Sequence, residues 1–346
     1  MVKFKHGNMD SLSLDSLGVI RDFVGKESYL SFGILARDFY ELWNCYPKYT
    51  RALTKDTTIV FLTHAFNLGL KKNFKILEII AKIGRLDLFC FCRAIGCPWS
   101  RKVPAKAASN GNINILKWAR LHGCLWDRST AIQSAKHGHL DILKWVRSQG
   151  CEWDSRVCSR SVYNNHFEIL KYARSENCPW DRHTSAYAAK NGNFEILQYC
   201  YNHGAPWDTL TVNYAALSGH LEILKWCRQR GCEWTTTTTT SAAKSGHLEI
   251  LKWCIQNGCS WTTDVTKYAA KRGHFEVFKW SIENGCPWSS IAICFAAASN
   301  GHLNILEYFN SFDAIRKDYL DMIFKVALVH GFPSITAWAN KKRLHV

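Results

Sequence analysis

A tryptophan recurs at a fixed interval over most of this chain. Each of eight tryptophans lies 27 residues from the next: Trp99, Trp126, Trp153, Trp180, Trp207, Trp234, Trp261 and Trp288. Self-similarity at a period of about 20 to 50 residues is typical of solenoids, in which each repeat packs only on its neighbours. The period therefore predicts a stack of short, similar repeats instead of an ordinary globular core.

Each repeat has the pattern of two short helices. The first ends in a pair of alanines, as at Ala242-Ala243, and the second follows a Gly-His pair, as at Gly246-His247. Apolar residues of the second helix, such as Leu224 and Cys227, fall around most of its circumference. Such a pattern indicates a helix buried between neighbouring repeats.

Glycine is expected to close both helices of a repeat. Gly219 follows a first helix and Gly231 a second one, at positions that favour a left-handed backbone conformation. Asn165 and Asn177 replace both glycines in one repeat. Asparagine is the next residue to tolerate that conformation, which supports the assignment.

The segment Ala-Ala-Lys-Ser-Gly-His-Leu-Glu-Ile-Leu-Lys (residues 242–252) resembles the second half of an ankyrin repeat. Ankyrin repeats are typically about 33 residues long, so about six residues are missing where the β-hairpin finger would lie. The resemblance implies an all-α, ankyrin-like helix-turn-helix solenoid with a short or absent finger. It is similar to the Cys-Pro-Trp arrays of large DNA viruses of amoebae and of some protists.

Three segments are expected: an N-terminal helical module at 1–55, the repeat array at 56–313, and a closing repeat with the tail at 314–346. The first lacks the tryptophan period, and its residues 12–43 resemble a degenerate F-box, although Ser13 stands where the usual proline would be. The resemblance implies docking of a Skp-type adaptor of a cullin ubiquitin ligase through Leu17, Ile20, Phe23, Leu35 and Phe39. The alternative is a helical cap that shields the first repeat.

Eleven of the fifteen cysteines recur in register, seven of them two residues before a repeat tryptophan and four in the second helix, and these are expected to be small buried hydrophobes. A reducing compartment is expected, because the N-terminus lacks the apolar core of a signal peptide. We expect a cytoplasmic protein (host cytoplasm if viral), with a nuclear address at 341–343 as the alternative to a solvated tail. No run of residues is long and apolar enough to span a membrane. His247 and Cys259 recur in register but lie twelve residues apart without a Cys-x-x-Cys pair, so no metal site is predicted.

The sequence contains no Gly-rich phosphate loop, nucleophile elbow or His-Glu-x-x-His motif, so we predict no catalytic residues, no cofactor and no enzyme activity. The slots two to seven residues after each tryptophan vary between repeats, and variation in a solenoid gathers on the surface that meets partners. In the early repeats these slots carry basic residues: Arg101, Lys102, Lys106, Arg128, Arg156, Arg160, Arg182 and His183.

The net charge is +16, and like charges one helical turn apart, as in Lys102 with Lys106, gain nothing locally. We therefore expect a protein partner with an acidic surface, against the alternative of a merely solvated face. The leading hypothesis is a protein-binding scaffold, with the F-box-like module making it a substrate receptor of an SCF-type ubiquitin ligase. The alternatives are a capped binding module without a ligase role, and a nucleic-acid-binding solenoid. The last is disfavoured because the aromatic side chains are expected to be buried, away from the charges.

Overall fold

The computed structural model describes residues 53–67 and 69–344, which contain 21 α-helices and no β-strand. The prediction of an all-α repeat fold without a hairpin finger is thereby confirmed for this part of the chain. Nearly all of the F-box-like module, including Leu17, Ile20, Phe23, Leu35 and Phe39, lies outside the described residues. The chain forms two compact bodies, an N-terminal body (1–126) and a C-terminal body (127–346).

The described part of the N-terminal body, residues 53–67 and 69–126, contains one leading helix and two helix pairs. Its helices are α3 (Ile59–Asn67), α4 (Phe74–Ile83), α5 (Leu86–Ala94), α6 (Lys102–Ser109) and α7 (Ile113–Leu121). Helix α3 precedes the first tryptophan of the period and was not expected from the repeat pattern. It packs on α5, as an added helix that covers the first repeat.

The C-terminal body contains eight helix pairs, the last of which is the closing pair. The helices are α8 (Arg128–Lys136), α9 (Leu140–Ser148), α10 (Arg156–Tyr163), α11 (Phe167–Ser175), α12 (Arg182–Lys190), α13 (Phe194–Asn202), α14 (Thr209–Ser218), α15 (Leu221–Gln229), α16 (Thr236–Lys244), α17 (Leu248–Gln256), α18 (Thr263–Arg272), α19 (Phe275–Glu283), α20 (Ser290–Ala298), α21 (Leu303–Asn310), α22 (Lys317–His330) and α23 (Pro333–Leu344). The last helix of the closing repeat is regular over 12 residues.

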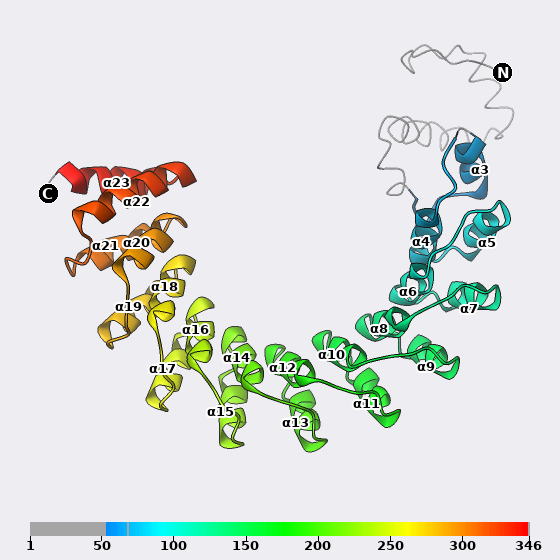
Figure 1. The fold of residues 1–346 in the computed structure, drawn as a ribbon, viewed down its shortest axis with the longest axis horizontal. Coiled ribbons are helices and arrows are strands. Elements are labelled where there is room, and N and C mark those ends of the chain that lie inside the picture. The colour runs from blue at the N-terminus through cyan, green and yellow to red at the C-terminus, as the bar shows by residue number, and fades with distance from the viewer. Residues whose placement is uncertain (1–52, 68, 345–346) are drawn as a thin grey trace, which may run out of the picture. The chain divides into compact units, whose positions relative to one another are not determined.

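The first helices of successive repeats form one row of the C-terminal body, and the second helices form another (Figure 1). Neighbouring first helices pack more closely than neighbouring second helices. The alanine pairs explain this, because small side chains let two backbones approach: Ala188 and Ala189 of α12, and Ala215 and Ala216 of α14, are fully buried. The sequence pattern identified these pairs, and their packing makes the first-helix row the tight side of each repeat.

A histidine of each typical repeat lies on a glycine of the preceding one. Gly219 has φ +86°, and a Cβ atom added there would come within 2.8 Å of the His247 ring. The same ring places Nε2 3.2 Å from the carbonyl oxygen of Leu217, near the end of the preceding first helix. The Gly-His pair therefore joins repeats as well as closing a helix. Asn112 has the same role in the N-terminal body, where its side-chain amide donates to the Ala81 carbonyl at 2.8 Å.

The cysteine before each repeat tryptophan also bridges two repeats. Cys259 is buried, and its Sγ lies 3.5 Å from the carbonyl oxygen of Thr235, one repeat earlier. Cys286 makes the equivalent contact with Thr262 at 3.6 Å. Burial raises the pKa of Cys259 to about 11 and that of Cys286 to about 12, so both thiols stay protonated at neutral pH. The prediction that these residues are small buried hydrophobes is confirmed, with an added weak hydrogen bond.

We predict that Gly219→Ala destabilises the protein more than Gly231→Ala. Both glycines have positive φ, which costs an alanine roughly 1–2 kcal/mol. At Gly219 the new methyl group also meets His247, whereas nothing lies within 4 Å at Gly231. Overpacking should add about 1–3 kcal/mol for Gly219→Ala, measured by urea unfolding followed by far-UV circular dichroism. Equal losses for the two variants would show that the histidine contact contributes nothing.

Candidate functional site

The first helices of the C-terminal body carry basic residues almost without acidic ones. Asp264 is the single acidic residue on the first helices α8, α10, α12, α14, α16, α18 and α20. The basic residues of these helices are Arg128, Lys136, Arg156, Arg160, Arg182, Lys190, Lys244, Lys267, Lys271 and Arg272. We call the surface formed by these helices the first-helix face.

The second helices differ, because their basic residues have acidic neighbours on the same helix. Glu222 pairs with Lys225 at 2.8 Å, and Glu249 pairs with Lys252 at 2.8 Å. These glutamates lie in the first turn, where the helix dipole also favours a negative charge. Charge on the second helices is thus balanced locally, and the positive excess is concentrated on the first-helix face.

Loop aspartates neutralise three of the predicted partner-binding arginines. Asp154 lies 2.7 Å from Arg156 and 3.4 Å from Arg128, and so joins two neighbouring repeats. Arg182 pairs in the same way with Asp208 at 3.1 Å. The pKa of Asp154 is lowered, mainly by the hydrogen bond that its carboxylate accepts from the Arg156 side chain. The structure therefore brings Arg128 and Arg156 together, around a carboxylate of the chain itself.

The other predicted residues are spread over both bodies. Arg101, Lys102 and Lys106 are exposed at the start of α6 and along it, and they form no ion pair with any described residue. Arg160 on α10 is half-buried and likewise has no ion-pair partner in the described ranges. His183 is half-buried at the start of α12, and its Nδ1 atom lacks a hydrogen-bond partner among the described residues.

Three tyrosines and a lysine form a cluster on α10, α12 and α14. Tyr163 meets Tyr187 edge-on at 4.9 Å between ring centroids, and Tyr187 stacks on Tyr214 at 6.1 Å. The Lys190 ammonium lies 4.9 Å from the centroid of Tyr163 and 5.7 Å from that of Tyr214. The expectation that aromatic residues are buried and separate from the charges is wrong here. A signal was present, since Tyr187, Tyr214 and Tyr268 all lie seven residues after a repeat tryptophan, within the variable slots.

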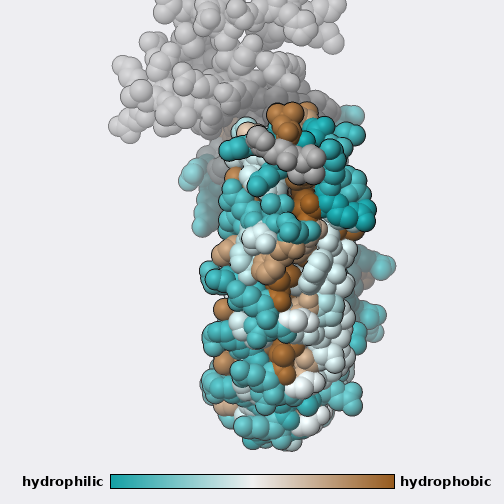
Figure 2. Space-filling model, turned by 90° about the vertical axis from the view of Figure 1, so that its left-hand side faces the viewer, coloured by the Kyte–Doolittle hydropathy of each residue, from teal (hydrophilic) through white to brown (hydrophobic). Residues whose placement is uncertain are grey.

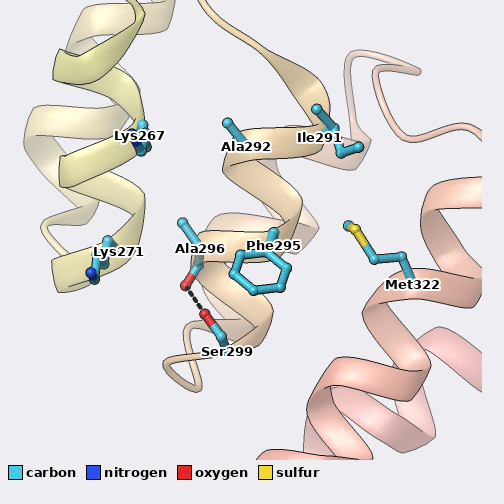
Figure 3. Close-up of a pocket in the computed structure, with 8 residues that line it drawn as sticks. All are labelled: Lys267, Lys271, Ile291, Ala292, Phe295, Ala296, Ser299 and Met322. Atoms are coloured by element: carbon cyan, nitrogen blue, oxygen red, sulfur yellow. Dashed lines mark hydrogen bonds between the residues drawn. The ribbon is translucent and has the colours of Figure 1, made fainter.

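Further along the same face, an apolar hollow of about 460 Å³ lies between α18, α20 and α22. Figure 3 shows Ile291 and Phe295 of α20 on the side towards Met322 of α22, with Lys267 and Lys271 of α18 across from them. Ile291 is 53% exposed and Phe295 51% exposed. Sequence reasoning missed this hollow, because it depends on the distance between helices of three repeats.

The end of the C-terminal body also exposes apolar surface. Figure 2 views the side on which α22 and α23 lie and shows a narrow apolar stripe between hydrophilic regions. Leu328 and Val329, in the last turn of α22, are among the exposed apolar residues of the closing pair.

Among the described residues, no group of His, Cys, Asp or Glu is arranged to hold a metal ion, and no helix is long and apolar enough to cross a membrane.

We predict that Asp154→Asn lowers stability by up to about 1 kcal/mol at pH 7, as expected for a partly exposed ion pair. Asparagine keeps an acceptor for the Arg156 backbone N–H and removes only the charge. Because the folded-state pKa of Asp154 is lowered, its stabilisation is present above the usual value of 3.8 and is lost as the pH falls through the folded-state pKa.

The urea midpoints of the wild type and of Asp154→Asn should therefore differ at pH 7 and converge once the pH is below the lowered folded-state pKa of Asp154. Glu152→Gln is the matched control, because the Glu152 carboxylate forms no ion pair with the described residues. A difference that persists unchanged at the low pH would refute the electrostatic explanation.

Comparisons with known proteins agree with the repeat pattern over part of the chain. A family model described as "Ankyrin repeats (many copies)" matches residues 186–232, from α12 to the end of the α15 repeat. No curated protein matches the chain in sequence.

Solved structures resemble the chain only distantly. The human ASB11 ankyrin repeat domain is 14% identical, with 45% of this chain and 84% of that chain covered and a TM-score of 0.37. The pentatricopeptide repeat protein PPR10, in complex with an 18-nucleotide psaJ RNA element, is 12% identical, with 96% and 56% covered and a TM-score of 0.45. Since both TM-scores lie below 0.5, the fold assignment rests on the helix pairs described above. The ankyrin-repeat match covers residues 186–232, and helix pairs of the same kind continue on both sides of that segment.

Proposed function

We propose that this chain is a non-enzymatic scaffold that binds an acidic protein surface through the first-helix face. Ankyrin-like repeats are protein-interaction modules, and the charge distribution supports the acidic character of the partner. The single observation that carries the proposal is the presence of ten basic residues and one acidic residue on the helices α8 to α20 of that face.

The excess of basic residues on the first helices does not stabilise the protein locally. Arg156 and Arg160 lie one turn apart on α10, an arrangement that costs a few tenths of a kcal/mol. Asp154 offsets the first of them, while Arg160, Lys190 and Lys244 have no ion-pair partner among the described residues. Carboxylates of a partner would complement these charges, which raises the rate of association and selects against basic partners.

The tyrosine–lysine cluster supports a protein partner over a nucleic acid. Tyrosine supplies contact area with little loss of conformational entropy and is enriched at protein interfaces. Non-specific binding of single strands requires aromatic faces on which bases stack. Here Tyr187 and Tyr214 stack on each other, and Lys190 lies against Tyr163 and Tyr214. The faces of these rings therefore contact other side chains of the chain itself, which disfavours stacking of bases on them.

The test compares two triple variants with the same change in charge. In one, Arg160, Lys190 and Lys244 of the first-helix face are replaced by glutamate; in the control, Lys117, Lys144 and Lys279 of the second helices are replaced. Partners are captured from cell lysate with the purified full-length protein and identified by mass spectrometry. The face variant should lose capture of acidic proteins at least tenfold, and the control should retain it.

Equal losses in both triple variants would refute a specific first-helix face. Capture that nuclease treatment abolishes would favour the nucleic-acid alternative instead. Raising the salt concentration should weaken capture by the wild type, because interactions between exposed charges are screened.

We also propose that the F-box-like module docks a Skp-type adaptor, which would make the protein a substrate receptor of an SCF-type ubiquitin ligase. The proposal is supported by the resemblance of residues 12–43 alone, which lie outside the described residues. Short amphipathic helices are marginal unless their apolar face is covered, and an adaptor would cover it. The rival is a module that only caps the first repeat.

Purified adaptor should bind the full-length wild type in calorimetry and fail to bind a Leu17→Glu, Phe39→Glu double variant whose far-UV circular dichroism is unchanged. If the intact chain does not bind adaptor, and the double variant loses thermal stability, the module is a cap and the ligase role falls.

A further inference from the structure

The hollow between α18, α20 and α22 is lined mainly by apolar side chains, whereas the rest of the first-helix face is mainly basic. Ile291 lies three residues after its repeat tryptophan, where the two preceding repeats have Thr237 and Asp264. Phe295 lies seven residues after it, where those repeats have Ser241 and Tyr268. Two large apolar side chains, each more than half exposed, thus stand together at positions that are polar or amphipathic in the two preceding repeats. Two adjacent exposed apolar side chains that line a hollow offer a contact surface for an apolar side chain of a partner.

The neighbouring helices leave this surface open. On one side α18 contributes Lys267 and Lys271, and on the other α22 contributes Met322, as Figure 3 shows. The closing pair has no Ala-Ala pair of the type found in the repeats, and α22 is 14 residues long where the first helices have eight to ten. The volume of about 460 Å³ falls within the range of roughly 300–1,000 Å³ of ligand-binding pockets.

We propose that this hollow anchors an aromatic or branched aliphatic side chain from an acidic segment of the protein partner. The inference rests on the proposed function and deepens it, because it names the anchoring point and the sequence character of the partner. Buried apolar anchors in a pocket, surrounded by a polar rim, are the arrangement that carries most binding energy at protein interfaces.

The apolar part of the occupant follows from the lining. Ile291, Ala292, Phe295, Ala296 and Met322 offer no hydrogen-bonding side chain. Ser299, which also lines the hollow, already donates its hydroxyl to the Ala296 carbonyl at 3.3 Å. A polar small molecule would thus find little to orient it, whereas an apolar side chain needs only the contact area.

The acidic part follows from the rim on α18. Lys267 and Lys271 lie one helical turn apart beside the hollow, and Arg272 follows at the end of the helix. Asp264 pairs with Lys267 at 3.2 Å and leaves the other two cations without an ion-pair partner among the described residues. No acidic residue lines the hollow. A second copy of this chain is a poor occupant, because its net charge is +16. A peptide with carboxylates flanking the anchor complements the rim.

The test selects ligands without assuming a sequence. A phage-displayed library of random twelve-residue peptides is panned against the full-length protein, and enriched peptides are synthesised with a fluorescent label. Affinities are measured by fluorescence anisotropy for the wild type, Phe295→Asp, Ile291→Ser and Lys271→Glu. Val329→Ser is the matched control, since Val329 is 81% exposed and does not line the hollow. Circular dichroism confirms that each variant is folded.

The expected peptides carry Phe, Trp, Leu or Ile next to Asp or Glu, and they bind Phe295→Asp and Ile291→Ser at least tenfold more weakly than the wild type and Val329→Ser. Lys271→Glu should weaken them about fivefold, an effect reduced by salt. Binding that is the same for wild type and Phe295→Asp overturns the inference. Enrichment of acidic peptides without an apolar consensus does so as well, while leaving the proposed acidic partner in place. Enrichment of basic or uncharged peptides alone would contradict the proposed function itself.

Discussion

The contact between successive first helices is the interaction on which each body of this protein depends. A solenoid has no contacts between distant repeats, so its stability is approximately a sum of repeat and nearest-neighbour terms. Here that interface consists of fully buried alanine pairs, a histidine seated on a glycine of the preceding repeat, and a cysteine directed at a carbonyl of the preceding loop. Each part demands a small or specially shaped residue. This demand explains why these positions recur while the exposed ones vary.

The helix caps that this architecture requires also shape the charge of the first-helix face. Asp208 accepts a hydrogen bond from the backbone N–H of Leu210 at 2.9 Å and at the same time pairs with Arg182. N-caps of this kind are worth about 0.5–2 kcal/mol, so the aspartate is favoured for the helix alone. Its second oxygen then neutralises an arginine. Where threonine provides the cap, as Thr235 does for α16, the position 26 residues earlier is Thr209 and carries no charge to neutralise. Capping by Asp208 therefore removes one arginine, Arg182, from the cations that are left for a partner.

In five repeats, an arginine packs on the repeat tryptophan at the loop between repeats. The Arg228 guanidinium lies 4.2 Å from the centroid of Trp234, and its Nη1 donates to the Cys232 carbonyl at 2.6 Å. This single side chain packs on the tryptophan and binds the end of the turn, which fixes the loop that leads into the next first helix. Tyr201 replaces the arginine in one repeat and packs on Trp207 edge-on at 4.9 Å between centroids. These contacts link the loop to the second helix that precedes it and so help to position the first helix that follows.

The sequence by itself determined the repeat, the two helices of each repeat and their ends. The period of 27 residues, the alanine pairs and the left-handed positions at Gly219, Gly231, Asn165 and Asn177 are local properties, and the backbone conformation at all four positions agrees. It also located the variable slots, because packing constrains the others. The partners of the side chains were decided only by the tertiary structure. Three such arrangements depend on the spacing between helices of different repeats. Asp154 joins Arg128 to Arg156, and Lys190 lies among three tyrosines. Phe295 and Met322 face one hollow. Spacing of that kind is set by the summed volumes of the buried side chains, which no single repeat encodes.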